Sequence, residues 1–195
     1  VHSFSYGAEE EWENEWEEAF LKLKELPGGF ELRGGRMLSR FGQHNTKHLH
    51  AWDFADMPLV WGRFLGDDGL RSIGGEVNWT LPVSWTSILT ASVGEIPAHE
   101  DSSHTERGGP KTKFDAEGAA YNDLFVAANW TNLYNYSDFH QFRAGISGAW
   151  GDNLWGRTTQ IYGAHFEYQW RENGLESGGR YFRWRTEALL RSIDA

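Results

Sequence analysis

The sequence contains no cysteine, which excludes disulfides, thiolate metal sites and a cysteine nucleophile. It also lacks any run of roughly 18 consecutive apolar residues, the length that a transmembrane helix needs. Basic residues are few: 18 lysines and arginines against 28 acidic residues give a formal net charge of −10. Nucleic acid is therefore not an expected partner, because binding phosphate groups requires a basic surface. The Gly-x-Ser-x-Gly and P-loop motifs are also missing, and we expect no enzymatic activity.

Aromatic residues and glycine are abundant instead. The 195-residue chain is 15% aromatic and contains 23 glycines, yet its mean hydropathy is only −0.60. Many aromatic residues in a polar chain predict segments with one apolar side and one water-facing side. The length is sufficient for one domain with a sizeable core and too short to argue for two.

From about residue 74 onward, apolar and polar residues alternate with a period of two, which predicts β-strands. In the clearest case, Tyr162, Phe166 and Trp170 share one side of a segment while His165 and Glu167 share the other. Similar alternation runs through residues 74–83, 121–134, 142–150 and 180–191. Strands in soluble proteins usually have about 5–6 residues. These segments alternate for about 10 residues, the length with which a tilted strand crosses a bilayer.

The connections between the predicted strands alternate in length. Tight turns are expected at residues 27–29, 83–84 and 136–137, with longer loops at 43–68, 98–118 and 151–156. Short turns at one end and long loops at the other are typical of an outer-membrane barrel. We therefore predict an all-β fold, an antiparallel transmembrane β-barrel with about eight strands in this chain. Residues 1–195 would form one barrel domain or a portion of a larger barrel.

Within that barrel, loops 43–68 and 98–118 are expected on the extracellular side. Residues 17–41 are expected to form a strand, a turn and a second strand, with a bulge or bend at Gly34-Gly35. Residues 1–16 fit neither a helix nor a strand clearly.

An alternative fold and function fit the same pattern. A soluble or surface-attached β-domain that binds carbohydrate would also alternate with a period of two, and its tryptophans would form platforms for sugars. Such a domain would be a monomer without detergent, and its tryptophan fluorescence would respond to glycans. The alternation of loop lengths favours the barrel.

Residues 17–96 contain a series of short motifs. They are Leu32-Arg33, Gly35-Arg36, Phe41-Gly42, Asn45, His48, His50, Trp52-Asp53-Phe54, Pro58-Leu59-Val60, and Leu81-Pro82 with Trp85. This series resembles a family of bacterial outer-membrane porin-like β-barrel proteins, often described as zinc-regulated TonB-dependent receptors. The chain departs from the family pattern at Met37, where an aromatic residue is usual, and at Arg40, where proline is usual.

The resemblance implies a location in the bacterial outer membrane, contact with its lipid, and passage of small solutes or ions, with a link to metal uptake as one alternative. Partner subunits or a homo-oligomer are compatible with it. A TonB-dependent gate needs a plug domain, and none precedes the expected barrel. The chain departs from the TonB-dependent description in this respect, and it is expected to be a portion of a longer barrel.

The stretch HNTKHLHAWDF, residues 44–54, offers two alternatives. His44, His48, His50 and Asp53 have the residue types and spacing to bind a divalent metal such as zinc. The alternative is that Asn45, Trp52 and Asp53 pack and hydrogen-bond this loop against the barrel wall, with the histidines as neutral donors, and we expect this packing. The following run is too apolar for a free loop. We therefore expect Leu59, Val60, Trp61 and Phe64 to fold back against the barrel mouth.

Charged residues of the later strands share the polar side of the alternation. Charges facing lipid are costly, so a membrane barrel would point them inward. The candidate pore-lining residues are Arg143, His165, Glu167, Arg183, Arg185 and Glu187. A small closed barrel is the alternative, with ion pairs inside it that serve structure alone.

Overall fold

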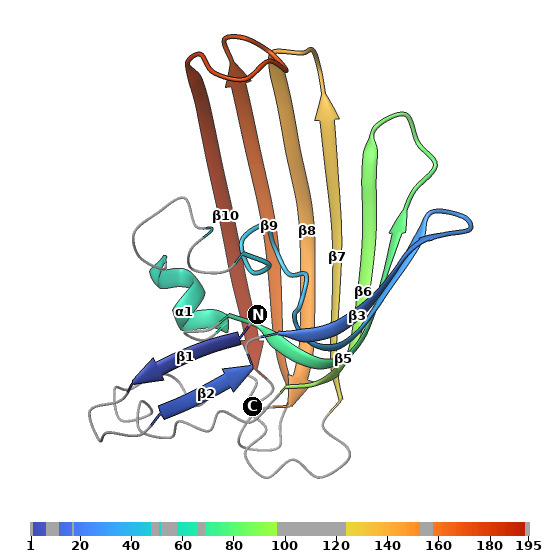
Figure 1. Ribbon diagram of the computed structural model, residues 1–195, viewed down its shortest axis with the longest axis vertical. Helices are drawn as coiled ribbons and strands as arrows, with labels where there is room; N and C mark the ends of the chain where they lie inside the picture. Colours follow the sequence, from blue (N-terminus) through green and yellow to red (C-terminus); the bar gives the residue numbers. More distant parts are fainter. Residues whose placement is uncertain are drawn as a thin grey trace.

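The computed structural model describes residues 2–6, 12–16, 18–47, 51, 58–65, 69–96, 124–152 and 158–193. One antiparallel sheet of eight strands dominates this part of the chain, and each strand pairs with its neighbours in sequence (Figure 1). The strands are β3 (Ala19–Leu26), β4 (Phe30–Leu38), β5 (Arg71–Thr80), β6 (Thr86–Glu95), β7 (Phe125–Asn135), β8 (His140–Asp152), β9 (Thr158–Arg171) and β10 (Tyr181–Ile193). The all-β, antiparallel prediction is therefore confirmed.

Two smaller elements complete the fold. A separate hairpin pairs β1 (His2–Tyr6) with β2 (Trp12–Trp16), in the region where the sequence showed no clear preference. The helix α1 (Leu59–Leu65) has seven residues and lies beside β10 (Figure 1). Among the described residues, no helix is long and apolar enough to cross a membrane.

The predicted tight turns and the first two longer loops are confirmed, but the third longer loop, predicted at 151–156, is wrong. Residues 27–29, 81–85, 136–139 and 172–180 connect the strands at one end of the up-and-down sheet. The connections at the opposite end are the long ones, 39–70 and 96–124, and residues 153–157, which are fewer than the residues of the 172–180 turn. The first turn depends on glycine, because Gly28 and Gly29 have φ angles of 81° and 82°, in the left-handed region.

The two faces of the sheet differ in polarity. We call the face that contacts residues 39–47 and α1 the inner face, and the opposite one the outer face. Polar side chains of the inner face are buried: Glu76, Asn78, Thr90, Asn129, Ser147, His165, Glu167 and Gln169. Apolar side chains of the outer face are exposed: Leu32, Leu89, Val93, Trp130, Ile146, Tyr162, Trp184 and Leu190. This polarity is the reverse of that in a sheet covering a water-soluble core.

An apolar core does exist, and it lies on the inner face at the end with the long connections. It comprises Phe41, Trp61, Leu65, Leu70, Phe125, Ala127, Ala149 and Ile161. Phe41 is fully buried and packs over β9 at Gly163, where a Cβ atom would come within 3.1 Å of its ring. The glycine thus leaves space for the aromatic ring.

The sheet is open, because β3 and β10 are its two edges and do not pair with each other. Of the bulge or bend expected at Gly34-Gly35, the bulge is wrong, since both residues stay in regular register with Gly75 and Gly74. Gly35 does have a positive φ of 135°. A Cβ at Gly35 would overlap the backbone of β3, so glycine permits a close approach there. The irregularity lies instead between Leu23 and Leu26, where Glu25 has a φ of 58°.

Candidate functional site on the inner face

The candidate pore-lining residues lie on three adjacent strands, β8, β9 and β10. Strand register places Arg143, Glu167 and Arg185 in one row across them, and the next row contains Gly145, His165 and Glu187. Arg183 belongs to the same alternating set on β10, opposite Gln169, and is more exposed. The prediction that these six charged or polar residues share one face is confirmed.

The first row is an ion-pair network. Arg185 Nε donates to Glu167 Oε2 at 2.7 Å, and Arg185 Nη2 forms an ion pair with the same oxygen at 2.7 Å. Arg143 Nη1 lies 3.9 Å from the other carboxylate oxygen. The Glu167 side chain is only 5% exposed. A hydrogen bond between a guanidinium and a carboxylate is stronger than one between neutral groups. Two arginines around one carboxylate leave a local excess of positive charge.

A second network, which was not predicted from the sequence, lies on β4 and β5. Arg33 donates two hydrogen bonds to Glu76, at 2.7 and 2.9 Å, and Asn78 donates a third at 2.9 Å. Arg40 approaches the same carboxylate at 3.3 Å and also contacts Glu31. The signal available in the sequence was the alternation itself, which put Glu76 and Asn78 opposite Val77, Trp79 and Leu81.

Burial lowers the pKa of Arg40, and the negative charge of Glu76 offsets part of that shift. The positive charge of Arg33 lowers this pKa further, and Glu31 raises it. The contacts of Arg40 with Glu31 and Glu76 join the inner face of the sheet to the residues that follow β4.

Residues 39–47, which we call the inner segment, cross the inner face. At one end, the Ser39 and Ser72 hydroxyls are 2.9 Å apart. At the other end, Gly42 N donates to Ser147 Oγ at 2.8 Å, and Gln43 N donates to Glu187 Oε1 at 3.2 Å. Three residues of extended chain span roughly 10 Å. Because the segment passes from Arg40 at β5 to Gln43 at β10 within that length, the sheet must curl around it.

Asn45 fixes the base of the inner segment. Its side-chain amide donates to the carbonyls of Ser39 and Leu70, at 2.7 and 2.9 Å, and its Oδ1 accepts from Leu70 N at 2.7 Å. Asn45 is 4% exposed. These three buried hydrogen bonds join Asn45 to Ser39, just after β4, and to Leu70, just before β5.

His44 is the one member of the predicted metal set that the structure describes. It is 5% exposed, and its ring lies 5.7 Å from the Trp61 ring. His48, His50 and Asp53 lie outside the described residues. No group of three or more metal-ligating side chains occurs among the residues that the structure describes. The packing of His44 agrees with the expected fold-back, and metal binding by the full set stays a prediction.

The apolar run after the histidines folds back as expected, and it does so as a helix. Trp61 is 5% exposed in the core, and Val60 and Phe64 pack against that core. The guanidinium of Arg191 lies 5.2 Å above the Phe64 ring. Leu59 belongs to the same helix, but its side chain lies outside the described set.

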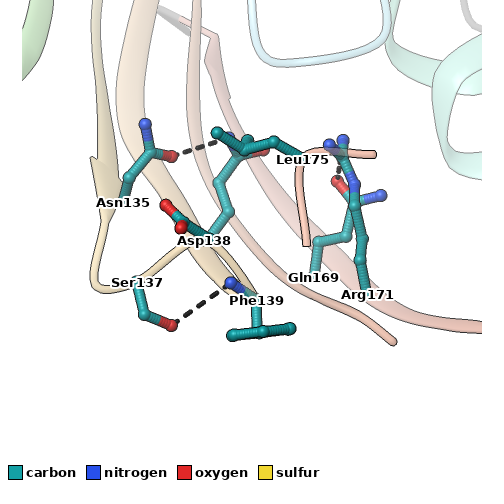
Figure 2. Close-up of a pocket in the computed structure, with 8 residues that line it drawn as sticks. Asn135, Ser137, Asp138, Phe139, Gln169, Arg171 and Leu175 are labelled. Atoms are coloured by element: carbon teal, nitrogen blue, oxygen red, sulfur yellow. Dashed lines mark hydrogen bonds between the residues drawn. The ribbon is translucent and has the colours of Figure 1, made fainter. Parts of the chain in front are cut away.

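A small hollow lies at the opposite end of the sheet, beside the short turns (Figure 2). Its volume of about 50 Å³ has room for a few water molecules. Its polar groups mostly pair with each other: Gln141 donates to Asn135 at 2.8 Å, and Arg171 donates to Gln169 at 3.2 Å. This hollow therefore offers little to a larger ligand.

No protein-family model matches this chain, and no solved structure matches it. Among curated proteins, the chain is similar to an uncharacterized protein of Aquifex aeolicus (strain VF5), with 44% identity over 77 residues. The similarity covers 40% of this chain and spans only 16% of the length of that relative.

Proposed function

We propose that this chain forms part of the wall of a porin-like β-barrel in the bacterial outer membrane, which passes small polar solutes or ions. The observation that carries the proposal is the reversed polarity of the sheet. Charged side chains such as Glu76 and Glu167 are buried on the inner face. On the outer face, Trp184 is 59% exposed and Leu190 is 67% exposed. A lipid environment accounts for both features, because it favours apolar contact outside and requires charges to face inward.

Contact of the outer face with lipid is more favourable than its contact with water. Each square ångström of apolar surface removed from water is worth about 25 cal/mol, and the outer face presents aromatic and aliphatic side chains on all eight strands. In water this face would be an unusually large apolar patch. An arginine turned toward the middle of a bilayer costs about 2–4 kcal/mol. Arg33, Arg143 and Arg185 all avoid that cost by facing inward.

The open edges support a larger barrel. Unpaired backbone groups are not tolerated in the hydrocarbon of a membrane, so β3 and β10 each require a further strand beside them. Direct pairing of these two edges is disfavoured, because β3 has eight residues and an irregular register whereas β10 has 13. The greater length of the Aquifex relative fits a protein with additional strands.

The inner segment and α1 would narrow the passage near the end with the long connections. The passage would then run along the Arg143–Glu167–Arg185 row, whose excess of arginine favours small anions over cations. The resembling family is described as zinc-regulated. Transport of a metal remains a further prediction of that resemblance.

Fractionation of cells that produce the full chain tests the proposal. We expect the protein in the outer-membrane fraction, soluble only with detergent, and with a gel mobility that changes on heating. A matched pair of variants sharpens the test. Ala164→Arg, on the outer face, should impair membrane assembly, while Gln141→Arg, on the inner face, should be tolerated. A detergent-free soluble monomer whose tryptophan fluorescence responds to glycans would contradict the proposal and support the carbohydrate-binding alternative.

A further inference from the structure

Arg191 is an arginine of the inner face without a described carboxylate partner. It lies near the end of β10, opposite the fully buried Ile161 of β9. Its Nη1 is closed off from solvent and makes no hydrogen bond with a described residue. Neither a hydrogen bond nor an ion pair joins its other nitrogens to the residues that the structure describes. Charges that are removed from water in proteins are usually paired, so the charge of Arg191 calls for a partner.

Two other arginines of the inner face show which partner fits. Arg33 presents the edge of its guanidinium formed by Nε and Nη2 to Glu76, and Arg185 presents the same edge to Glu167. In Arg191 the closed-off nitrogen is Nη1, so its Nε–Nη2 edge remains within reach of solvent. This edge carries two parallel N–H groups, which match two oxygens of a carboxylate or a phosphate.

The helix α1 brings a second arginine to the same place. The ring of Phe64 covers one face of the Arg191 guanidinium at 5.2 Å, and α1 contacts β10. Arg63, the neighbour of Phe64 in α1, is exposed and close enough for its positive charge to act on Arg191. A cation is favourable in the last turn of a helix, which accounts for the presence of Arg63 there. No described carboxylate pairs with either arginine.

The two like charges define the class of ligand. They repel each other, and an anion that contacts both would replace this repulsion with attraction. A metal cation would add a third positive charge, and an uncharged solute would leave both charges unpaired. Planar guanidinium groups favour oxyanions, whose oxygens accept two hydrogen bonds side by side.

We propose that Arg63 and Arg191 bind a small oxyanion of the phosphate class, at the end of the inner face with the long connections. The proposal rests on the proposed function, because it supplies a capture site for the anions that the Arg143–Glu167–Arg185 row favours. Binding itself is measured in detergent, and its failure is separate from a failure of membrane location.

The phosphorus NMR line width of inorganic phosphate, mixed with the purified full chain in non-ionic detergent, measures binding. We expect broadening that sulfate reverses and that sodium chloride at equal ionic strength does not. Arg63→Gln and Arg191→Gln should each raise the Kd about five- to tenfold, because each removes one of the two charges. Arg180→Gln is the matched control, since it removes the same charge from the turn at the opposite end of the sheet. It should leave the Kd unchanged.

Two further measurements test other partners for the arginines. Short-chain phosphatidylglycerol, added to the micelles, presents a lipid phosphate, and it should not displace inorganic phosphate because α1 lies on the inner face. Asp67 and Asp68 follow α1 in the sequence and lie outside the described residues. If the arginines are available to an external ion, the double variant Asp67→Asn with Asp68→Asn should tighten phosphate binding less than about fivefold.

Thermal melts provide a readout that does not depend on how well the single variants fold. Phosphate should raise the Tm of the parent chain more than sodium chloride does at equal ionic strength, because it binds the folded state. The double variant Arg63→Gln with Arg191→Gln should lose this additional increase. Absence of broadening with the parent chain, unchanged affinity in both single variants, displacement by phosphatidylglycerol, or a larger gain in the aspartate variant would overturn the proposal.

Discussion

Arg33 and Glu76 face each other across β4 and β5, and the guanidinium donates two hydrogen bonds of 2.7 and 2.9 Å to a carboxylate that is fully buried. A buried ion pair contributes little net stability compared with apolar residues of similar size. Its disruption is costly, because the remaining charge has been removed from water without its partner.

Removal of one partner should therefore destabilise the protein more than removal of both. Leaving a buried charge unpaired costs about 3–5 kcal/mol, and we expect Arg33→Leu to lower the free energy of unfolding by less than that, because Arg40 and Asn78 still contact Glu76. The double variant Arg33→Leu with Glu76→Leu should recover part of that loss. Urea unfolding of the detergent-solubilised chain provides the measurement. A double variant that loses as much stability as Arg33→Leu, or more, would contradict this prediction.

Phe41 anchors the inner segment to β9, and its truncation should weaken that anchor. Phe41 is fully buried in the core. Phe41→Ala should therefore lower the free energy of unfolding by about 3–5 kcal/mol, as large-to-small core substitutions do. Phe139→Ala is the control, because Phe139 lies in a short turn and is 47% exposed. Its effect should be small. Similar Tm values for the two variants would contradict the burial of Phe41.

The turn between β9 and β10 should respond to acid. Arg180 donates to Glu172 at 2.7 Å, and this hydrogen bonding holds the pKa of the Glu172 carboxyl below its usual range. A depressed pKa in the folded state means that the pair contributes above the unfolded pKa and is lost as pH falls through the folded one. NMR titration should give a lower pKa for Glu172 than in Arg180→Ala. The same pKa in both chains would contradict the pairing. Any effect on stability should be small, because the pair is exposed to solvent.

The sequence predicted the strands and their faces because the side-chain period of a strand is two and depends on local order alone. For this reason His165 and Glu167 were correctly placed together on one face with Arg143. The turn at Pro27-Gly28-Gly29 could also be predicted from local sequence, because it depends on the conformational freedom of glycine.

The position of the inner segment could not be predicted from the sequence, because its contacts join residues that are far apart in the chain. Gly42 and Ser147 are separated by 105 positions, and no periodic pattern links them. The pairing of Arg33 with Glu76 likewise needs the register of β4 on β5, which alternation does not specify. The helix α1 has only seven residues, too few to distinguish a helical period from a buried apolar run.

Spin labels on single cysteines test the central claim, the reversed polarity of the sheet in a membrane, most directly. The chain has no native cysteine, so each label occupies one defined site. Ala144, Ile146 and Ala164 are suitable outer-face positions, and Thr131 and Gln141 are suitable inner-face positions. In vesicles, outer-face labels should collide more with oxygen, which dissolves in lipid, and inner-face labels more with a water-soluble nickel chelate. Outer-face labels that collide mainly with the nickel chelate would contradict the account.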